Sequence, residues 1–373
     1  MTLERRKDPE MIDFEPSESQ RILLKTAKDF FNKEGKDFLR KLEKSEQAHS
    51  PEIWRKMAEL GWMGLPFPEA YGGFEGSILD LILLFEEMGK ALIPSPLIPT
   101  LACGLAILKF GTEEQKNDFL PAISGGERIV SPALTASPSP PIERGTKGEF
   151  ILTGRRRFVP YGNVADWFLY SGRLEQGETV FLVDGSGRGI QRRLLKTLAA
   201  DGQSEIFLER IEVPEKYLLG KAGEGHNIAE SIEEYGALFY SAFILGLLER
   251  VLAMAVEYAK QREQFGKLIG SFQAIQHQCA DMMTEIEKVK YLTYVAAWKV
   301  SDQDCASYEI AAAKARASDA ARSVCMLGIK IHGGVGITEE HDLQLYFRMA
   351  KSAELACGDG DYHREKIARL LSL

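Results

Sequence analysis

Two short segments in the last third of the chain carry residue types that bind phosphate-containing ligands. The first combines Arg262, Phe265 and Gln273 around a break between two helical stretches. A guanidinium can pair with a pyrophosphate through two hydrogen bonds, and a side-chain amide can hydrogen-bond an adenosine or ribose edge. In the second segment, Gly333 and Gly334 let backbone N–H groups approach a phosphate closely. Each segment also has a plainer interpretation: a helical hairpin with a solvated face, and a loop that ends a helix.

The elements that must position these segments change in character twice along the chain. Helical spacing of apolar residues predicts helices across about 16–124, and short runs of β-branched and aromatic residues predict strands across about 126–222. The pattern is helical again from about 223, where the apolar segment 242–258 indicates a helix inside a bundle. This order predicts an α+β multidomain protein with an N-terminal helical domain, a middle β-barrel or sandwich domain and a C-terminal helical bundle. The predicted domains are residues 1–125, 126–222 and 223–373.

Composition and charge argue against several other classes of protein. The chain has 373 residues and a net charge of −8, which supplies no basic surface for nucleic acid, although Arg155–Arg157 form a short basic run. The uncharged apolar stretch 237–248 is shorter than the ~20 residues of a membrane span, and the first residues lack the apolar core of a signal peptide. The 5 cysteines contain no CxxC pair, which argues against a disulfide framework and a zinc site. We therefore expect a cytoplasmic protein without a metal, a membrane span or a nucleic-acid partner.

In this order and at this separation, the segments resemble the acyl-CoA dehydrogenase family, and the resemblance covers nearly the whole chain. It implies an N-terminal helical domain, a β domain and a C-terminal four-helix bundle. It also implies FAD as cofactor, oxidation of the Cα–Cβ bond of an acyl-CoA thioester, electron-transfer flavoprotein as electron acceptor, and a tetramer of one chain or of two. The matching blocks are PEAYGG at 68–73, ADWF at 165–168, YAKQREQFG at 258–266, FQAIQH at 272–277 and HGGVG at 332–336.

The resemblance also implies flavin-binding roles for six residues. Contacts to the diphosphate and adenosine of FAD in a neighbouring subunit would come from Arg262, Phe265 and Gln273. A backbone cradle near the pyrophosphate would be formed by Gly333 and Gly334, and Phe158 would pack against the isoalloxazine. Nearby, Pro160 replaces the hydroxyl residue that usually hydrogen-bonds the flavin near N5.

The usual catalytic base is absent from both positions where the family carries it. Cys357 stands at the position of the Glu in the family's Tyr-Glu-Gly-Thr run, and Gly236 stands near the position used on the preceding long helix. A thiolate could remove the substrate α-proton if its pKa were depressed, but Asp359 and Asp361 would raise the pKa of Cys357. Three interpretations stay open: Cys357 as base, Cys357 as an inert filler of the vacated space, and Asp359 as a substitute base.

Two further departures lie at the flavin or thioester end of the expected site. The family's Thr-Glu-Pro-x-Ala-Gly-Ser-Asp loop has become TASPSPP at 135–141, and an Arg common in the family is Ala237. The residues around His341 and Tyr346 resemble the base-less subunits of heteromeric acyl-CoA dehydrogenases that act on steroid side chains or pimeloyl-CoA. We therefore expect the subunit without the Glu, paired with a second acyl-CoA dehydrogenase chain that carries it. The alternatives are a homotetramer with Asp359 as base, a flavin-free structural subunit, and an oxidase or monooxygenase of the same fold.

Overall fold

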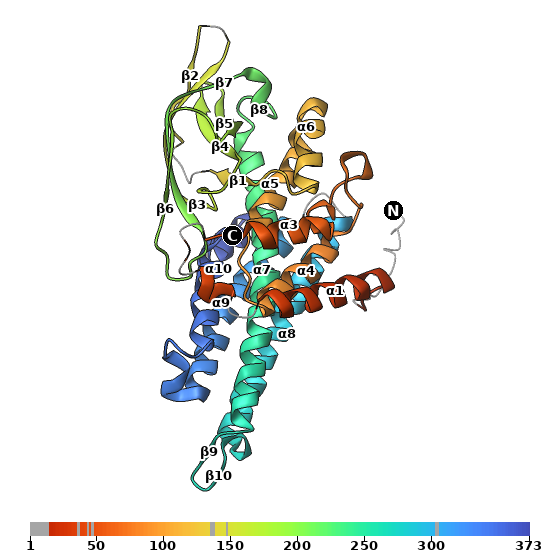
Figure 1. Cartoon of the computed structure of the whole chain (residues 1–373), viewed down its shortest axis with the longest axis vertical. Coiled ribbons are helices and arrows are strands. Elements are labelled where there is room, and N and C mark those ends of the chain that lie inside the picture. Colours follow the sequence, from red (N-terminus) through yellow and green to blue (C-terminus); the bar gives the residue numbers. More distant parts are fainter. Residues whose placement is uncertain are drawn as a thin grey trace.

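The computed structural model describes residues 15–35, 38–42, 45, 48–134, 139–146, 148–302 and 306–373. Helices make up the first part of the chain (Figure 1). Ser17, Ser77 and Thr112 each accept a hydrogen bond from a backbone N–H of the first turn, and so fix where three of these helices begin. The helices are α1 (Glu18–Glu34), α2 (Phe38–Leu42), α3 (Pro51–Glu59), α4 (Ile78–Lys90), α5 (Leu97–Phe110) and α6 (Glu113–Ser124), with the 3₁₀ turns η1 (Trp62–Gly64) and η2 (Glu69–Tyr71).

The middle of the chain forms two separate four-stranded sheets. The first has the order β1-β4-β5-β8 and the second the order β2-β3-β7-β6. The rings of Phe150 and Phe181, on β3 and β5, lie 4.9 Å apart and join the two sheets in one core. The described strands therefore form a sandwich rather than a closed barrel. The bounds are β1 (Val130–Ala133), β2 (Glu143–Arg144), β3 (Phe150–Pro160), β4 (Trp167–Leu174), β5 (Gly177–Asp184), β6 (Ile190–Leu194), β7 (Gln203–Val213) and β8 (Leu218–Leu219), with η3 (Glu215–Tyr217) between the last two.

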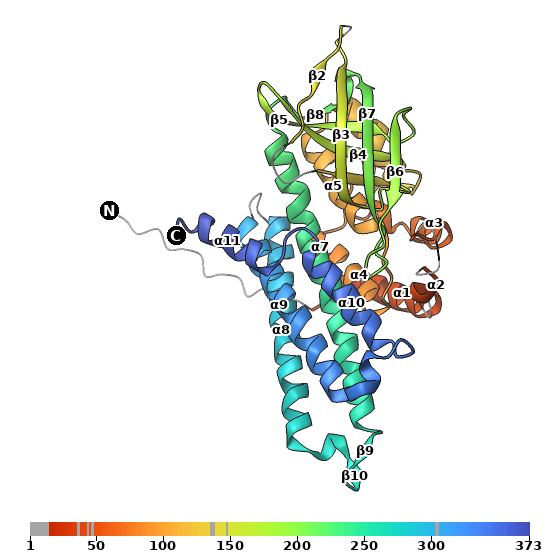
Figure 2. The same ribbon diagram turned by 90° about the vertical axis from the view of Figure 1, so that its left-hand side faces the viewer.

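The last part of the chain is a bundle of long helices built around α7, with the β9–β10 hairpin at its far end (Figures 1 and 2). By length and composition α7 could cross a membrane, but most of its most apolar stretch is buried against other helices, as expected of a core helix. The expected three-part architecture is thus confirmed. The elements are α7 (Gly225–Ala259), β9 (Glu263–Gln264), β10 (Lys267–Leu268), η4 (Ile269–Ser271), α8 (Gln273–Asp302), α9 (Ser307–His332), η5 (Gly333–Ile337), α10 (Leu343–Leu355) and α11 (Gly360–Leu370).

The three parts share contacts that fix where α7 and α10 lie. Gly89 on α4 and Gly246 on α7 face the backbone of the opposite helix so closely that neither position has room for a Cβ atom. On the other side, Ser352 of α10 donates a hydrogen bond to Asp201, in the loop before β7. The N-terminal helices, the sheets and the bundle therefore meet around the upper half of α7 and the end of α10 (Figure 2).

Candidate active site

Cys357 lies in the turn between α10 and α11 and faces α7. Its Sγ is 2.5 Å from the position that a Cβ atom on Gly236 would occupy. The two positions at which the resemblance leads us to expect a base are therefore neighbours in space, and neither has a carboxylate. Cys357 has a φ of 54° and Gly358 a φ of 88°. A left-handed conformation costs a non-glycine residue about 1–2 kcal/mol, so surrounding contacts must hold this turn.

Lys314 and His363 hold the Cys357 turn from two sides. From α9, the Nζ atom of Lys314 donates to the carbonyls of Glu354 and Gly358, both at 2.7 Å. From α11, His363 Nε2 lies 2.8 Å from the carbonyl oxygen of Cys357 and therefore donates to it. Lys314 is fully buried, and burial lowers its pKa to about 8. Sequence reasoning missed Lys314, because its role depends on which helices meet at the turn; for His363 it favoured packing near the end of the bundle.

The surroundings of Cys357 keep its thiol protonated. The pKa of Cys357 is raised to about 12, chiefly by burial and also by the Glu233 carboxylate, whereas Lys314 opposes both effects. A neutral thiol does not accept a proton from a substrate at physiological pH. The environment therefore favours the interpretation of Cys357 as a filler.

The carboxylates near Cys357 are engaged elsewhere. Asp359 is the N-cap of α11 and accepts a hydrogen bond from the backbone N–H of Tyr362 at 3.0 Å. That hydrogen bond is the largest of the effects that lower the pKa of Asp359, which makes it a weaker base. Glu233, one helical turn before Gly236 on α7, accepts a hydrogen bond from the Tyr362 hydroxyl at 2.7 Å. Burial raises the pKa of Glu233.

At the far end of the bundle, Arg262 and Phe265 lie in the hairpin that contains β9 and β10. The Phe265 side chain is 91 % exposed and has a φ of 54°, with its ring 6.1 Å from that of Phe272. Arg262 is exposed and forms no ion pair among the residues that the structure describes. Gln273 is the exposed first residue of α8, beside the same hairpin. An open aromatic ring and an exposed guanidinium thus lie on the same hairpin.

The structure brings the glycine segment to the same end of the bundle. The rings of Tyr258, near the end of α7, and His332, the last residue of α9, stack with their centroids 4.5 Å apart. Gly333 and Gly334 follow directly, and no atom lies within 4 Å of the position of a Cβ atom on either of them. The exposed backbone of this segment is therefore accessible to a ligand, next to the hairpin that carries Arg262.

Phe158 lies in another region, on β3 in the β part of the molecule. A register shift between Arg156 and Val159 marks a β-bulge, and within it Phe158 has a φ of 56° and is 67 % exposed. The sheets and the β9–β10 hairpin lie toward opposite ends of the long axis (Figures 1 and 2). One chain therefore does not bring Phe158 together with Arg262 and Phe265. Of the altered loop at 135–141, the first four residues lie outside the described residues.

Comparisons with known proteins identify the family to which this chain belongs. The acyl-CoA dehydrogenase N-terminal domain matches residues 17–127, and the acyl-CoA dehydrogenase C-terminal domain matches residues 223–372. Acyl-CoA dehydrogenase FadE27 of Mycobacterium tuberculosis is 32 % identical over 345 residues, covering 89 % of this chain and 91 % of that protein. The chain belongs to the acyl-CoA dehydrogenase family. The expected family is confirmed, and with it the enzyme class: an oxidoreductase that acts on the CH–CH group of acyl-CoA, with FAD as the cofactor of the family.

Solved structures match the chain over nearly its whole length. Butyryl-CoA dehydrogenase from Megasphaera elsdenii has a TM-score of 0.90 and 29 % identity, covering 97 % of this chain and 100 % of that one. A chain of the ChsE4-ChsE5 complex from Mycobacterium tuberculosis has a TM-score of 0.89 and 30 % identity, covering 97 % and 99 %. The fold and the order of the domains are therefore those of the family.

The residues present fit the FAD of an acyl-CoA dehydrogenase at its adenylate end. The open glycine backbone at Gly333 and Gly334, the exposed Phe265 ring and the free Arg262 guanidinium offer hydrogen bonds, stacking and charge to a dinucleotide. At the flavin end, Phe158 offers an exposed ring. These features lie on separate parts of one chain, as expected if each FAD is bound by two chains.

Proposed function

We propose that this chain is the subunit without the catalytic Glu of a heteromeric FAD-dependent acyl-CoA dehydrogenase in the cytoplasm. A second acyl-CoA dehydrogenase chain would carry the Glu. The observation that carries the proposal is the contact between Cys357 and Gly236, because it fills both base positions with groups that cannot accept the α-proton. The ChsE4-ChsE5 complex is a structural relative made of two different chains, which supports a heteromeric assembly.

In such a complex this chain would bind and orient the FAD, and the partner chain would remove the α-proton of the acyl-CoA. FAD, when bound, would supply the hydride acceptor for the β-carbon, and electron-transfer flavoprotein would be the electron acceptor. Arg262, Phe265 and Gln273 would hold the adenylate part of the FAD bound to the neighbouring subunit, beside Gly333 and Gly334.

One alternative names a specific catalytic residue: a homotetramer that uses Asp359 as its base. The hydrogen bond from Tyr362 N and the lowered pKa of Asp359 weigh against this alternative. Asp359 nevertheless follows the Cys357 turn directly, so an experiment must separate the two possibilities.

The test is to express the chain alone and together with candidate partner chains, and to follow flavin reduction by acyl-CoA without oxygen. We expect no dehydrogenation by the chain alone, recovery on co-expression with a chain that carries the Glu, and little effect of Cys357→Ser. Full activity without a partner, abolished by Asp359→Asn, would replace the heteromer with the homotetramer.

A gain-of-function variant tests the same proposal from the other side. Cys357→Glu returns a carboxylate to the vacated position, and a general base contributes about 10²–10⁴-fold in rate. We expect the variant to reduce its own flavin measurably faster than the wild-type chain when both are purified alone. Cys357→Gln is the matched control, because it has nearly the same shape and cannot accept the proton.

A further inference from the structure

One arginine of the N-terminal helices binds the loop that follows the glycine segment. From α2, Arg40 donates through Nη1 to the carbonyl oxygen of Glu339 at 2.8 Å and through Nη2 to that of Glu340 at 2.9 Å. The same Nη2 and Nε also donate to Asp342 Oδ1, at 2.8 and 3.3 Å. A single guanidinium thus joins segments that are 299–302 residues apart in sequence. No function assigned above uses Arg40.

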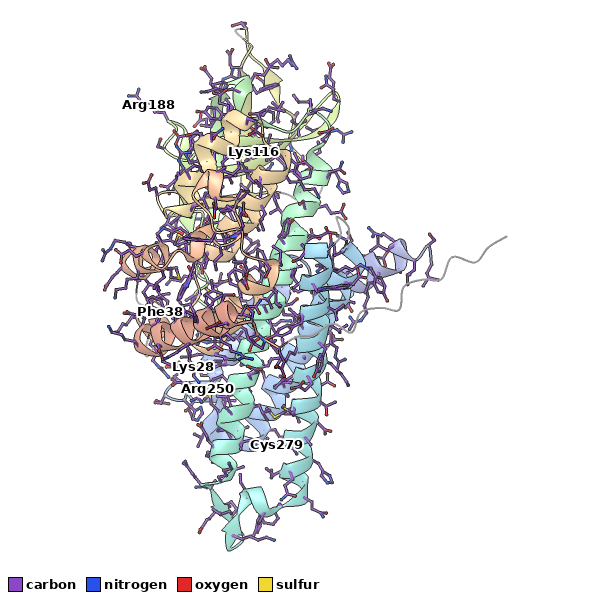
Figure 3. The ribbon with its side chains drawn as sticks, turned by 90° about the vertical axis from the view of Figure 1, so that its right-hand side faces the viewer. Lys28, Phe38, Lys116, Arg188, Arg250 and Cys279 are labelled. Atoms are coloured by element: carbon purple, nitrogen blue, oxygen red, sulfur yellow. The ribbon has the colours of Figure 1, made fainter. Side chains whose placement is uncertain are left out.

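The helix that carries Arg40 is firmly anchored. Three of its five side chains are buried in the hydrophobic core: Phe38, Leu39 and Leu42. In Figure 3, Phe38 lies on the same side of the molecule as Arg250 of α7. Because the guanidinium is planar, one anchored side chain can meet three acceptors in defined directions, which a lysine ammonium on its flexible stem does not do.

The loop that Arg40 binds has little packing of its own. Residues 337–340 are exposed, and the turn is closed by hydrogen bonds from Thr338 N to Val335 O at 3.2 Å and from His341 N to Thr338 O at 3.3 Å. Two of the three acceptors of Arg40 are backbone carbonyls, so the guanidinium restrains the path of the chain as well as a side chain. Arg40 is therefore a direct link between this loop and the N-terminal helices.

The loop passes this restraint to the glycine segment through two histidine rings. The ring of His341 lies 4.9 Å from that of His332, at an angle of 64°. The Nδ1 atom of His341 accepts a hydrogen bond from Leu343 N at 3.1 Å, and His332 is held by its stack with Tyr258. His341 thus packs against the residue that directly precedes Gly333.

A second contact folds the glycine segment back onto His332. The position of a Cβ atom on Gly336 lies 2.9 Å from His332 Cβ and 3.2 Å from Leu343 Cδ2, so the segment approaches both residues closely. Gly333 and Gly334 have no atom within 4 Å of such a position, so their flanking residues must set their conformation. Ordering a flexible backbone costs binding free energy, so a cradle with fixed flanks binds more tightly.

We propose that Arg40 is a positioning residue for the Gly333–Gly334 cradle. It holds the loop that follows the cradle and, through His341 and His332, the backbone N–H groups that face a bound phosphate. The inference rests on the proposed function for the identity of that phosphate, the diphosphate of FAD, whereas the effect on the loop requires no ligand. The N-terminal helical part then helps to set a cofactor site of the bundle, although Arg40 lies outside the residues assigned to FAD.

Hydrogen exchange of the full chain without added flavin tests the effect on the loop. Arg40→Gln removes the fork, and charge-assisted hydrogen bonds are strong enough for us to expect the backbone amides of 333–342 to exchange about tenfold faster or more. Arg40→Lys keeps the charge without the fork and should give an intermediate rate. Arg55→Gln is the matched control: Arg55 is an exposed arginine of α3 that pairs with Glu59 at 2.8 Å, and its loss should leave 333–342 unchanged.

Ligand binding to the assembled protein tests the effect on the cradle. Arg40→Gln should bind FAD and ADP at least about fivefold more weakly, the lower range of coupling between separate sites, and should bind FMN as the wild type does. Arg40→Lys should recover part of the affinity for FAD. Because Arg40 acts through His341, the effects of Arg40→Gln and His341→Ala on FAD binding should be less than additive.

Three results would overturn the proposal. One is unchanged exchange of 333–342 in Arg40→Gln or, if that variant does not fold, in Arg40→Lys. The second is faster exchange with unchanged affinity for FAD and ADP, or with FMN weakened equally, since Arg40 would then only join two parts of the fold. The third is a wild-type assembly that binds neither FAD nor ADP. If that assembly binds ADP in an Arg40-dependent way but not FAD, the proposed function fails and the positioning role stands.

Discussion

The thiol of Cys357 occupies space that the missing side chain of Gly236 leaves free, with Sγ 2.5 Å from the position of a Cβ atom on that glycine. Helix α7 is otherwise continuous through this point, so the glycine is not needed to end or bend it. The two departures from the family pattern are therefore one packing unit. Neither base position carries a carboxylate, and the Cys357 thiol fills the space beside Gly236.

We expect Gly236→Ala to lower the free energy of unfolding by about 1–3 kcal/mol, because its Cβ overpacks against the Cys357 thiol. The better helix propensity of alanine, up to about 1 kcal/mol, does not offset this clash. In a Cys357→Ala background the same change should be neutral or stabilising, since the sulfur is gone. Urea denaturation of the four combinations measures the coupling.

Gly125→Ala is the control, because the nearest atom to its Cβ position is 3.4 Å away, at ordinary contact distance. Gly125→Ala should change the free energy of unfolding by the same amount with and without Cys357. Equal effects of Gly236→Ala in both backgrounds would mean that the contact with Cys357 has no energetic consequence.

Sequence reasoning reached the architecture and the unusual cysteine, but not the residues that hold that cysteine in place. Local signals, such as the short runs of β-branched and aromatic residues that predict the strands, depend on neighbours in the chain, and the structure confirms them. Lys314 gains its role from a turn that is distant in sequence, so no spacing could reveal it, whereas His363 lies on the helix that directly follows Cys357. The domain boundaries at 125/126 and 222/223 and the flavin-contact residues stay predictions.

Acid should destabilise the protein partly through His363. Its Nε2–H donates to the Cys357 carbonyl, and its Nδ1 is buried without a hydrogen-bond partner among the described residues. Burial lowers the pKa of His363 to about 4 from 6.5. Between these values the unfolded chain binds more protons than the folded one, so the stabilisation is complete above pH ~6.5 and is lost as the pH falls. The loss amounts to about 3 kcal/mol at most.

His363→Gln can still donate to the Cys357 carbonyl but does not titrate, so its stability should fall less than that of the wild type between pH 6.5 and 4. His49→Gln is a matched comparison, because burial also lowers the pKa of His49 to about 4 and its ring packs against Trp54 instead. Only the His363 variant should change the rate at which iodoacetamide modifies Cys357. Parallel stability curves for wild type and His363→Gln would exclude the buried imidazole as a source of acid sensitivity.

Lys314 should make the protein more stable as the pH rises through the alkaline range. Burial lowers the pKa of its ammonium group to about 8 from 10.5, so between these values the unfolded chain again binds more protons. The Lys314→Met variant lacks this titration and leaves the carbonyls of Glu354 and Gly358 without their donor, at a cost of about 1–3 kcal/mol.

The stability of the wild type minus that of Lys314→Met should therefore increase from pH 8 to 10.5, by about 3 kcal/mol at most. Taking this difference removes the opposite contribution of Cys357, whose raised pKa lowers stability over the same range in both proteins. Lys351→Met is the control for the loss of a lysine side chain, because it removes a half-exposed lysine of α10. A difference that stays constant for Lys314→Met would show that this lysine keeps an ordinary pKa.

The last prediction concerns Phe265, whose ring is 91 % exposed on the β9–β10 hairpin. Because the side chain buries almost nothing within its own chain, Phe265→Ala should change the free energy of unfolding by less than about 0.5 kcal/mol. If the ring packs on the adenine of FAD in a neighbouring subunit, the assembled variant should retain less flavin after gel filtration, and Arg262→Gln should act in the same direction. Leu198→Ala removes another exposed apolar side chain, 63 % exposed on the β part, and should lose no flavin. Full flavin content in assembled Phe265→Ala/Arg262→Gln would remove this hairpin from the cofactor site.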